Sequence, residues 1–348
     1  MGNFNLTNPR IIGFWIFCFL CVNCININTA LAEKHRWNFL VAHNPTNYEN
    51  NDLIKKFIKT ISEKSNADLE IKIQTLADTF TNPHPIAIGN VFRGEVEMSQ
   101  VAIDRLYKYC PEMDALDAPL VFRNHEHAEK VLDGAIGDQL KKCLLTGSNG
   151  RLHGLYFTYS GGYRNIYSLK PLNSLRDLRG MRMGERGGRL GNDLMDYLGV
   201  EFTFYPPFLK DFMQQHEKKE IDAEEAEINR MVAFGKAYPE QMSNAKYMLE
   251  TNHSLYLTLL VVNGSAYNAL SKKNKLMLEQ EAKKLAKSER LLSIKQEMNN
   301  KKDLMSRGVI FQKISEEDLQ TLQRLSKRVY RKYQKSLGSL IQSIKQVK

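Results

Sequence analysis

One uninterrupted helical pattern near the C-terminus limits the possible folds of this chain more than any other feature. From Ser271 to about Arg307, almost nothing in the sequence breaks helical periodicity. At a rise of 1.5 Å per residue, a helix of this extent would be about 55 Å long. Because that length exceeds the diameter of one small domain, we expect the helix to run along two.

Strand-like and helical segments alternate through the rest of the chain. Such alternation at these lengths predicts parallel βαβ units and an α/β fold. The pair Gly161-Gly162 predicts a turn. The expected strands lie at 37–42, 69–73, 96–98, 152–158, 181–183, 201–204 and 255–262, and the expected shorter helices at 53–65, 85–92 and 190–198.

The first 32 residues have the features of a secretory signal peptide. They contain no acidic residue and one basic residue, Arg10, and their apolar run from Ile11 to Cys24 is about 14 residues long. That run is too short to cross a bilayer of roughly 30 Å as a helix. Ala30-Leu31-Ala32 supplies a small-x-small cleavage pattern, so we expect export with Glu33 as the new N-terminus. An uncleaved N-terminal anchor is the alternative.

The cysteines of the exported chain leave two possibilities open. Only Cys110 and Cys143 remain after cleavage, and they could pair in an oxidising compartment or stay as two semi-buried thiols. The remaining chain has neither a CxxC motif nor a Cys/His zinc spacing. We therefore expect no metal site and no cofactor.

The basic charge of the chain is concentrated in one segment. The chain has 348 residues, 43% hydrophobic content and a net charge of +10, which together exclude a disordered chain and a polytopic membrane protein. Residues 271–348 hold 20 basic and 8 acidic residues, whereas the remaining 270 hold 29 and 31. We interpret this surplus mainly as the solvated faces of long helices, with docking to a membrane partner as a hypothesis for the remainder, and not as a nucleic-acid site.

Four stretches, in order, resemble the DctP-type solute-binding subunits of TRAP transporters. The resemblance runs from Trp37 to about Tyr333. The stretches are Pro111-Glu112 with 118–123 and 127–134; 162–166 with 170–172 and 177–182; 220–225; and 251–253 with 262–263 and Leu270.

The resemblance implies a two-lobed α/β clamshell that holds its ligand between the lobes, with the long helix crossing both. It places lobe I at 33–160, with about 255–290 returning to it, and lobe II at 161–254, with about 291–348 packing on it and on the hinge. It also implies a monomeric periplasmic protein without catalysis, which captures a small anionic organic solute and delivers it to TRAP membrane subunits.

Arginines are the main candidate ligand residues, because relatives in this family mostly hold a carboxylate and the planar guanidinium gives two parallel hydrogen bonds. Arg164, in Gly162-Tyr163-Arg164, falls on a family ligand-contacting arginine; the alternative is a structural role at the hinge. Arg105 aligns with a ligand-contacting position of sialic-acid-binding relatives; the alternative is an exposed helix arginine.

The sequence departs from the family at two ligand positions. Gly184 stands where the principal carboxylate-clamping arginine is expected, and Ala226 where many relatives have Asn or Trp. Arg182 would point to the other face of its strand. Arg186 or Arg189 could act as a surrogate, with Arg186 the preferred candidate, since the glycine-rich loop before a helix favours an anion. Another possibility is a less anionic ligand, with Glu225 and its neighbours Glu224 and Glu227 holding a cation or an amine.

The other candidates are weaker. Asn44 lies in a loop after a strand, where α/β sheets bind ligands, as do Asn47, Asn82 and His84. Phe208 is near a family aromatic contact. His125 and His127 could suggest a metal, but a solvated helix start is favoured because i and i+2 point apart on a helix. We expect His253 to stabilise a hinge.

Two alternative functions are a sensor or interaction protein and an enzyme. A periplasmic sensor or interaction protein would share the fold and use an altered ligand site. An enzyme is disfavoured, because no Ser/His/Asp or Cys/His arrangement and no paired carboxylates emerge. The sequence does not identify the solute.

Overall fold

The computed structural model describes residues 34–348 apart from 43–49, 77–81, 185–187, 205 and 207. The expected signal peptide therefore lies outside the described residues. Among the described residues, no helix combines the length and apolar character that crossing a membrane requires.

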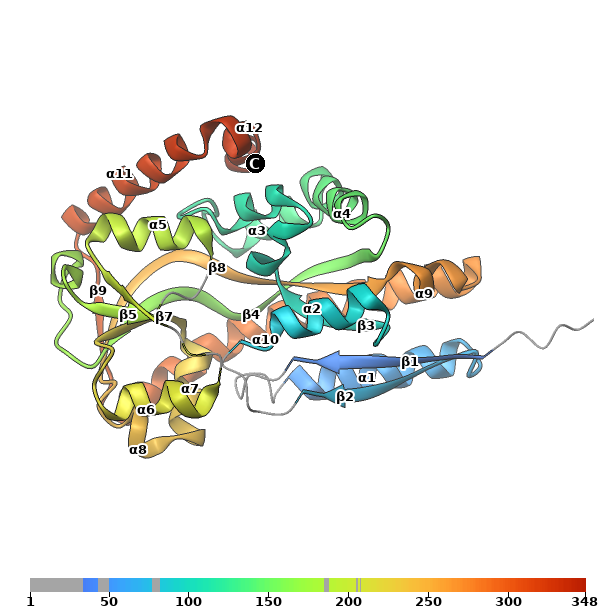
Figure 1. The fold of residues 1–348 in the computed structure, drawn as a ribbon, viewed down its shortest axis with the longest axis horizontal. Helices are drawn as coiled ribbons and strands as arrows, with labels where there is room; N and C mark the ends of the chain where they lie inside the picture. The colour runs from blue at the N-terminus through green and yellow to red at the C-terminus, as the bar shows by residue number, and fades with distance from the viewer. Residues whose placement is uncertain (1–33, 43–49, 77–81, 185–187, 205, 207) are drawn as a thin grey trace, which may run out of the picture. The chain divides into compact units, whose positions relative to one another are not determined.

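A single mixed sheet of nine strands organises the described chain (Figure 1). Its strand order is β2-β1-β3-β8-β4-β7-β5-β6, and β9 pairs with β8. The strands are β1 (His35–Val41), β2 (Leu69–Thr75), β3 (Met98–Ala102), β4 (Leu152–Ser168), β5 (Arg182–Gly184), β6 (Glu201–Thr203), β7 (Ala223–Glu227), β8 (Tyr247–Asn263) and β9 (Ile310–Lys313).

Helices connect these strands, and those expected at 53–65, 85–92, 190–198 and 271–307 are all present. The α-helices are α1 (Asn50–Lys64), α2 (His84–Arg93), α3 (His125–Leu132), α4 (Ala135–Gly147), α5 (Arg189–Leu198), α6 (Leu209–Glu217), α7 (Ile228–Ala237), α8 (Pro239–Met242), α9 (Gly264–Ala269), α10 (Lys272–Ser306), α11 (Glu316–Lys332) and α12 (Gln334–Gln346). The 3₁₀ helices are η2 (Ile103–Lys108), η3 (Pro111–Asp117) and η4 (Leu175–Leu178).

The two expected βαβ blocks are confirmed at opposite ends of the sheet. β1 pairs in parallel with both β2 and β3, and β5 pairs in parallel with both β6 and β7. Between these ends run β4 and β8, two antiparallel strands of 17 residues each. The same two strands therefore take part in both ends of the sheet.

The expected long helix is α10, which has 35 residues. Ser271 caps it by accepting a hydrogen bond from the backbone N–H of Asn274, which satisfies one of the donors that a helix N-terminus leaves free. The helix contacts α1 of the first block, β4, and α7 of the second block. Both blocks thus share α10, as its length predicts.

The expected turn at Gly161-Gly162 is wrong. β4 continues through both glycines, and its register with β8 shifts between Tyr159 and Tyr163, which marks a bulge. Gly161 has φ +109° and Gly162 has φ +90°, a backbone region that favours glycine. The glycine pair signals positive φ correctly, but the chain uses it to bend a strand rather than to end it.

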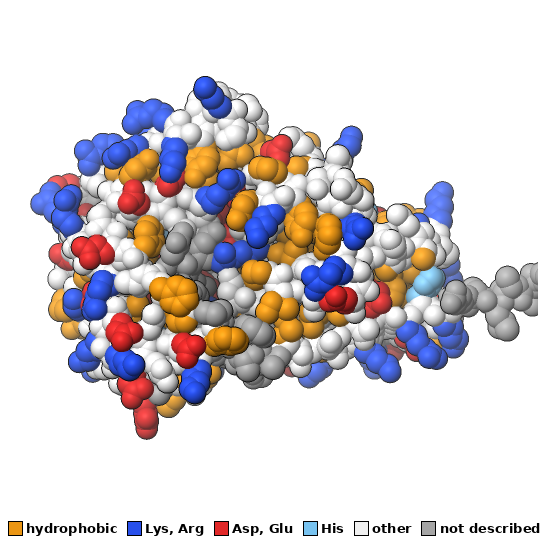
Figure 2. Space-filling view, in the orientation of Figure 1, with side chains coloured by type: hydrophobic (Ala, Val, Ile, Leu, Met, Phe, Trp, Pro, Cys, Tyr) orange, Lys and Arg blue, Asp and Glu red, His pale blue; other side chains and the backbone are white. Residues whose placement is uncertain are grey.

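The basic C-terminal helices are part of the body of the protein. α11 packs on α5, and α12 packs on η3 with Leu337, Ile341 and Ile344 buried. Arg123 donates hydrogen bonds to the carbonyls of Lys345 (2.9 Å) and Val347 (2.6 Å). On the face drawn in Figure 2, Lys and Arg side chains are spread among acidic and apolar ones rather than gathered in one patch. This distribution fits solvated helix faces.

Cys110 and Cys143 form a disulfide bond, with their Cα atoms 5.6 Å apart. Cys110 lies between η2 and η3, and Cys143 lies in α4. Of the two possibilities that the sequence leaves open, the structure has the paired one. The disulfide fixes the end of η2 and the start of η3, the two segments that supply acidic residues to the site described next.

Candidate functional site

The centre of the candidate site is Arg164 on β4. Its backbone lies between Glu227 of β7 and Ser254 of β8, so the residue starts from the middle of the sheet. The residue is 8% exposed. A guanidinium buried at this position must be compensated by acceptors, because an unpaired charge in the interior is costly.

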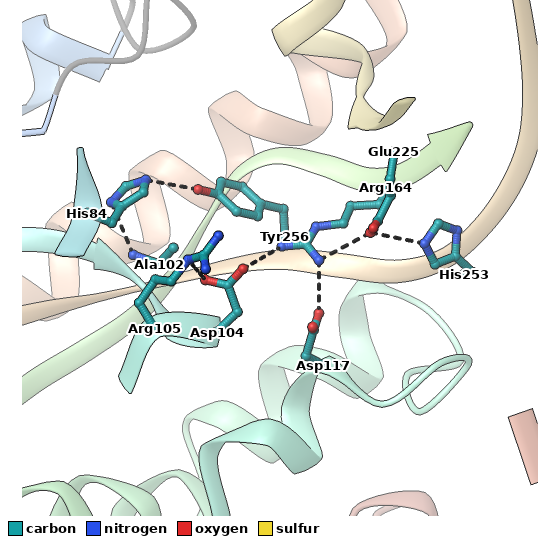
Figure 3. A network of polar contacts seen from close by, with 9 residues as sticks. All are labelled: His84, Ala102, Asp104, Arg105, Asp117, Arg164, Glu225, His253 and Tyr256. Atoms are coloured by element: carbon teal, nitrogen blue, oxygen red, sulfur yellow. Dashed lines mark hydrogen bonds and ion pairs between the residues drawn. The ribbon is translucent and has the colours of Figure 1, made fainter. Parts of the chain in front are cut away.

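Three carboxylates provide that compensation (Figure 3). Arg164 Nη1 lies 3.2 Å from Asp117 Oδ1 of η3 and 3.2 Å from Glu225 Oε1 of β7, and Nη2 lies 3.4 Å from Asp104 Oδ2 of η2. All three acids are buried. Segments far apart in the sequence therefore meet at one arginine.

Aromatic and histidine side chains hold this cluster in place. The ring of Tyr256 lies under the guanidinium, 5.0 Å from Arg164 Cζ. His84 Nδ1 accepts a hydrogen bond from the N–H of Ala102 (3.3 Å), which leaves the proton on Nε2, 3.0 Å from the Tyr256 hydroxyl. The tyrosine that supports Arg164 is thus itself anchored by the start of α2.

His253 performs a similar role for Glu225. Its Nε2 lies 3.1 Å from Glu225 Oε1, and its Nδ1 lies 2.8 Å from the Thr251 hydroxyl. If the threonine donates to Nδ1, then Nε2 carries the proton and donates to the carboxylate. The imidazole is fully buried and its contacts are with protein groups, in line with the expectation that it stabilises structure.

The site has an electrostatic asymmetry. Burial is the main reason that the pKa of the Asp117 carboxyl rises to about 7, and the neighbouring acids Asp104, Glu225 and Asp114 add to it. Burial disfavours the charged form of Arg164, yet the carboxylates, Asp117 first, raise its pKa above the ordinary value. Arg164 therefore stays charged, whereas the pKa of the Asp117 carboxyl lies close to neutral pH.

The other expected arginine, Arg105, lies at the edge of this cluster. Its Nε is 3.5 Å from Asp104 Oδ1, and its side chain is half-buried. With its amide oxygen turned toward Arg105, Asn82 accepts a hydrogen bond from Nε at 3.0 Å. Arg105 is therefore joined to Arg164 through Asp104 and is not a solvated helix arginine.

The remaining expected site residues divide into three groups. Glu225 contacts Arg164 directly. Phe208 precedes α6, is 48% exposed, and is not among the residues drawn in Figure 3. Asn44, Asn47 and Arg186 lie outside the described residues, so the surrogate role of Arg186 stays a prediction. Arg189, the other candidate surrogate, donates from Nε to Asp114 Oδ2 at 2.6 Å.

The suggestion that Glu224, Glu225 and Glu227 act together on a cation is wrong for Glu224. Neighbouring residues of a strand point to opposite faces, and Glu224 bonds to the Tyr167 hydroxyl and lies 3.3 Å from Arg230 Nη2 on the face away from Arg164. Arg182 pairs with Asp222 at 2.9 Å, in line with its expected outward direction. Neither residue contributes to the cluster around Arg164.

The expected solvated helix start at His125 and His127 is also wrong in one respect. The residues do begin α3, but His127 is 3% exposed and its Nε2 lies 2.9 Å from the Ile344 carbonyl of α12. His125 packs against the rings of Tyr159 and Tyr163. The two imidazoles face different neighbours, which agrees with rejecting a shared metal.

Sequence reasoning missed Asp104, Asp117 and Tyr256. Asp117 stands directly before Ala118-Pro119, inside a stretch that carries the family resemblance, and Asp104 directly precedes Arg105. Their positions were therefore close to recognised ones. Nothing local marks an acid as the partner of an arginine about 50 to 60 residues away.

Comparison with protein families gives one match over most of the chain. Residues 41–336 match the model of DctP, described as bacterial extracellular solute-binding protein, family 7. A curated relative, the 2,3-diketo-L-gulonate-binding periplasmic protein of Escherichia coli K12, is 27% identical over 221 residues. That match covers 62% of this chain and 62% of the relative, about three fifths of its length.

Solved structures share the fold. A TRAP periplasmic solute-binding protein from Roseobacter denitrificans with bound β-D-glucuronate has a TM-score of 0.79 at 20% identity, covering 90% of this chain and 100% of the other. One from Haemophilus influenzae with bound L-gulonate has a TM-score of 0.78 at 21% identity, with the same coverage. The α/β fold expected from the sequence is confirmed by these likenesses.

Proposed function

Because the chain belongs to family 7 of the bacterial extracellular solute-binding proteins, the DctP family, we propose that it captures a small organic carboxylate and delivers it to TRAP-type membrane subunits. A family of solute-binding proteins also agrees with the expectation that the protein is not an enzyme. The observation that carries the proposal is Arg164. Its guanidinium is buried at the centre of the sheet and is the side chain on which elements from both ends of the sheet converge.

The ligands of related proteins support the carboxylate class. The names of the relatives describe 2,3-diketo-L-gulonate in E. coli, β-D-glucuronate in R. denitrificans and L-gulonate in H. influenzae, all of which are sugar acids. An arginine that engages a carboxylate through two parallel hydrogen bonds suits that class. The solute would enter between lobe I (33–160 with about 255–290) and lobe II (161–254 with about 291–348).

The proposal places the mature protein in the periplasm as a monomer. The signal-peptide features of residues 1–32 support export, and the disulfide between Cys110 and Cys143 suits an oxidising compartment. Membrane subunits of the TRAP type would receive the solute. Nucleic acid is not part of this proposal, because the basic surplus lies on helices that pack into the body.

The test combines native mass spectrometry with thermal-shift measurements. Protein purified from cells is sprayed intact to weigh any retained solute, and a panel of uronates, aldonates, dicarboxylates and amino acids is screened for stabilisation. Ligand bound only to the folded state raises the melting temperature, and the rise grows with the ratio of the free ligand concentration to Kd. We expect at least one carboxylate to stabilise the protein.

A matched pair of variants assigns the effect to Arg164. Arg164→Lys keeps the buried positive charge but loses the planar fork, so we expect binding to weaken about tenfold or more. Arg176→Lys changes an exposed arginine that pairs with Glu317 at the surface and should leave affinity unchanged. If no carboxylate binds while the protein still associates with a membrane partner, the sensor alternative replaces the transport proposal.

A further inference from the structure

The exposed face of α10 carries charge of one sign. All five acidic residues of this helix are buried or half-buried. Seven of its lysines are exposed, namely Lys272, Lys273, Lys283, Lys284, Lys287, Lys295 and Lys302. A solvated helix face commonly alternates basic and acidic side chains. The exposed face of α10 is therefore basic without any acidic side chain.

Large apolar side chains alternate with some of these lysines. Six exposed residues, three or four positions apart, lie on one face of the helix over about 27 Å and form what we call the α10 stripe: Lys287, Leu291, Lys295, Met298, Lys302 and Met305. Leu291, Met298 and Met305 are 70%, 61% and 55% exposed. Within the described part of the chain, the three lysines of the stripe form no ion pair. A regular row of apolar side chains in water indicates a binding surface.

A groove between α1 and α10 adjoins the stripe. Its volume is about 420 Å³, within the range of about 300–1,000 Å³ that is common for ligand pockets. It is lined by Leu53, Lys56, Phe57 and Thr60 of α1 and by Glu281, Lys284, Leu285, Lys287 and Ser288 of α10. Glu281, the acid in this lining, already pairs with Lys64 and Lys284. The groove thus combines apolar walls with more basic than acidic groups, and Lys287 belongs to both the groove and the stripe.

We propose that the α10 stripe and the adjoining groove bind the anionic surface of a phospholipid bilayer. The lysines would contact headgroup phosphates, and the apolar side chains would enter the boundary between headgroups and acyl chains. The groove gives the apolar part of one lipid a place beside Lys56 and Lys287. The inference goes beyond the proposed function and does not depend on which solute the protein captures.

Charge and side-chain type distinguish a bilayer from other partners. A second copy of this chain would bring one basic, acid-free face against another, and the like charges would repel each other. A nucleic acid would use the lysines but would leave Leu291, Met298 and Met305 in water. An anionic bilayer presents phosphates and apolar groups together along the whole length of the stripe. It is therefore the partner that uses both kinds of side chain.

Vesicle sedimentation tests the proposal on the exported protein. Vesicles of phosphatidylcholine alone are compared with an equimolar mixture of phosphatidylcholine and phosphatidylglycerol. We expect binding to the mixed vesicles to be about tenfold tighter or more, and to weaken as salt is raised from about 0.05 M to about 0.15 M. Absence of binding to the mixed vesicles would overturn the proposal and would leave an acidic protein surface as the partner that fits these lysines.

Two variants with the same change in net charge locate the binding surface. Lys287→Gln, Lys295→Gln and Lys302→Gln, combined in one protein, should weaken binding about a hundredfold, since each lysine near an anionic surface contributes about fivefold. The control combines Arg324→Gln, Lys327→Gln and Lys335→Gln, which changes exposed residues of α11 and α12, and it should bind within about threefold of wild type. Equal losses in the two variants would show that overall net charge drives binding, and the proposal would be wrong.

Fluorescence quenching tests the groove. Ser288→Trp places an indole in the groove, whereas Gln323→Trp places one at an exposed position of α11. Trp37, which is 4% exposed, gives the same background in both proteins. Phosphatidylglycerol with brominated acyl chains should quench the added fluorescence of Ser288→Trp alone, and equal quenching of both would contradict the assignment. Carboxylate affinity, measured without vesicles, should be the same for the triple Lys→Gln variant and wild type, so failure of the proposed function would be seen separately.

Discussion

At the scale of single residues, the buried charges explain why some substitutions are poor probes of function. The sequence suggests that Arg164→Ala would remove binding without unfolding the protein. In the structure, however, that change would leave Asp104, Asp117 and Glu225 without their shared cation. Removing one partner of a buried ion pair costs about 3–5 kcal/mol. Arg164→Lys, which keeps the charge, is therefore the informative change.

Glu289 gives a prediction about pH at the same scale. This residue of α10 is 1% exposed, and its Oε2 accepts a hydrogen bond from Gln100 at 3.1 Å. Burial raises its pKa from 4.5 to about 8. The folded protein therefore binds a proton that the unfolded chain releases above pH 4.5, so the stability contribution of this group falls as the pH rises from about 4.5 to about 8.

We expect Glu289→Gln to remove this dependence. Relative to wild type, the variant should gain on the order of 3 kcal/mol between pH 5 and pH 8.5, measured by denaturant unfolding at both values. Asp303→Asn, which changes an acid on the same helix with 38% side-chain exposure, serves as the control and should show no comparable gain. Equal pH profiles for wild type and Glu289→Gln would contradict the assignment.

At the scale of elements, side chains of α10 form hydrogen bonds with β4 near the bulge of that strand. The N–H of Gly161 donates to Ser293 Oγ at 3.1 Å, and Arg290 donates to the Phe157 carbonyl at 2.6 Å and pairs with Asp133. Because these contacts are polar, the spacing of apolar residues in α10 does not predict them. The helix is thus held by side-chain hydrogen bonds at the point where β4 changes register.

A side chain at Gly162, one of the two glycines of this bulge, should destabilise the protein. A Cβ there would lie 2.4 Å from the Glu297 carboxylate of α10, in addition to the strain of φ +90°. Gly150 is a matched control, because its φ of +77° imposes similar strain and no atom lies within 4 Å of its added Cβ. We expect Gly162→Ala to be less stable than Gly150→Ala by about 1–2 kcal/mol in chemical denaturation. Equal losses would show that the Glu297 contact is not limiting.

At the scale of the whole molecule, the two ends of the sheet share β4, β8 and α10. Among the described residues, the ends otherwise come from separate stretches, β1 to β3 on one side and β5 to β7 on the other. Arg164, on β4, contacts acids from η2 and η3, which follow β3, and from β7. A solute that binds at this arginine would therefore touch groups from both sides, and closure of the lobes is the expected response.

Small-angle scattering tests that closure. We expect the radius of gyration of the protein to fall when a solute identified by the thermal-shift screen is added at saturation, because the lobes approach each other. Arg164→Lys should show the smaller value only at solute concentrations about tenfold higher or more. An unchanged radius of gyration for the saturated wild-type protein would contradict a clamshell mechanism.

Local patterns alone predicted most of the strands of this fold and the helices α1, α2, α5 and α10. Apolar spacing placed α1, α5 and α10 within one to three residues of their observed ends, and alternating or apolar runs placed β1 and β2. These signals are local because helix and strand periodicity depend on neighbouring residues. β7, β9 and the bulge in β4 were not predicted, since pairing with distant strands determines all three.

The sequence by itself determined the α/β class, the long helix and the family resemblance, and it selected Arg164 as a candidate ligand residue. Only the tertiary structure decided that Cys110 pairs with Cys143 and that Asp104, Asp117 and Glu225 surround one guanidinium. The physical reason is the range of the interactions. Backbone periodicity is set within a few residues, whereas a buried charge is compensated by whichever groups the folded chain brings within about 4 Å, and no local pattern records those partners.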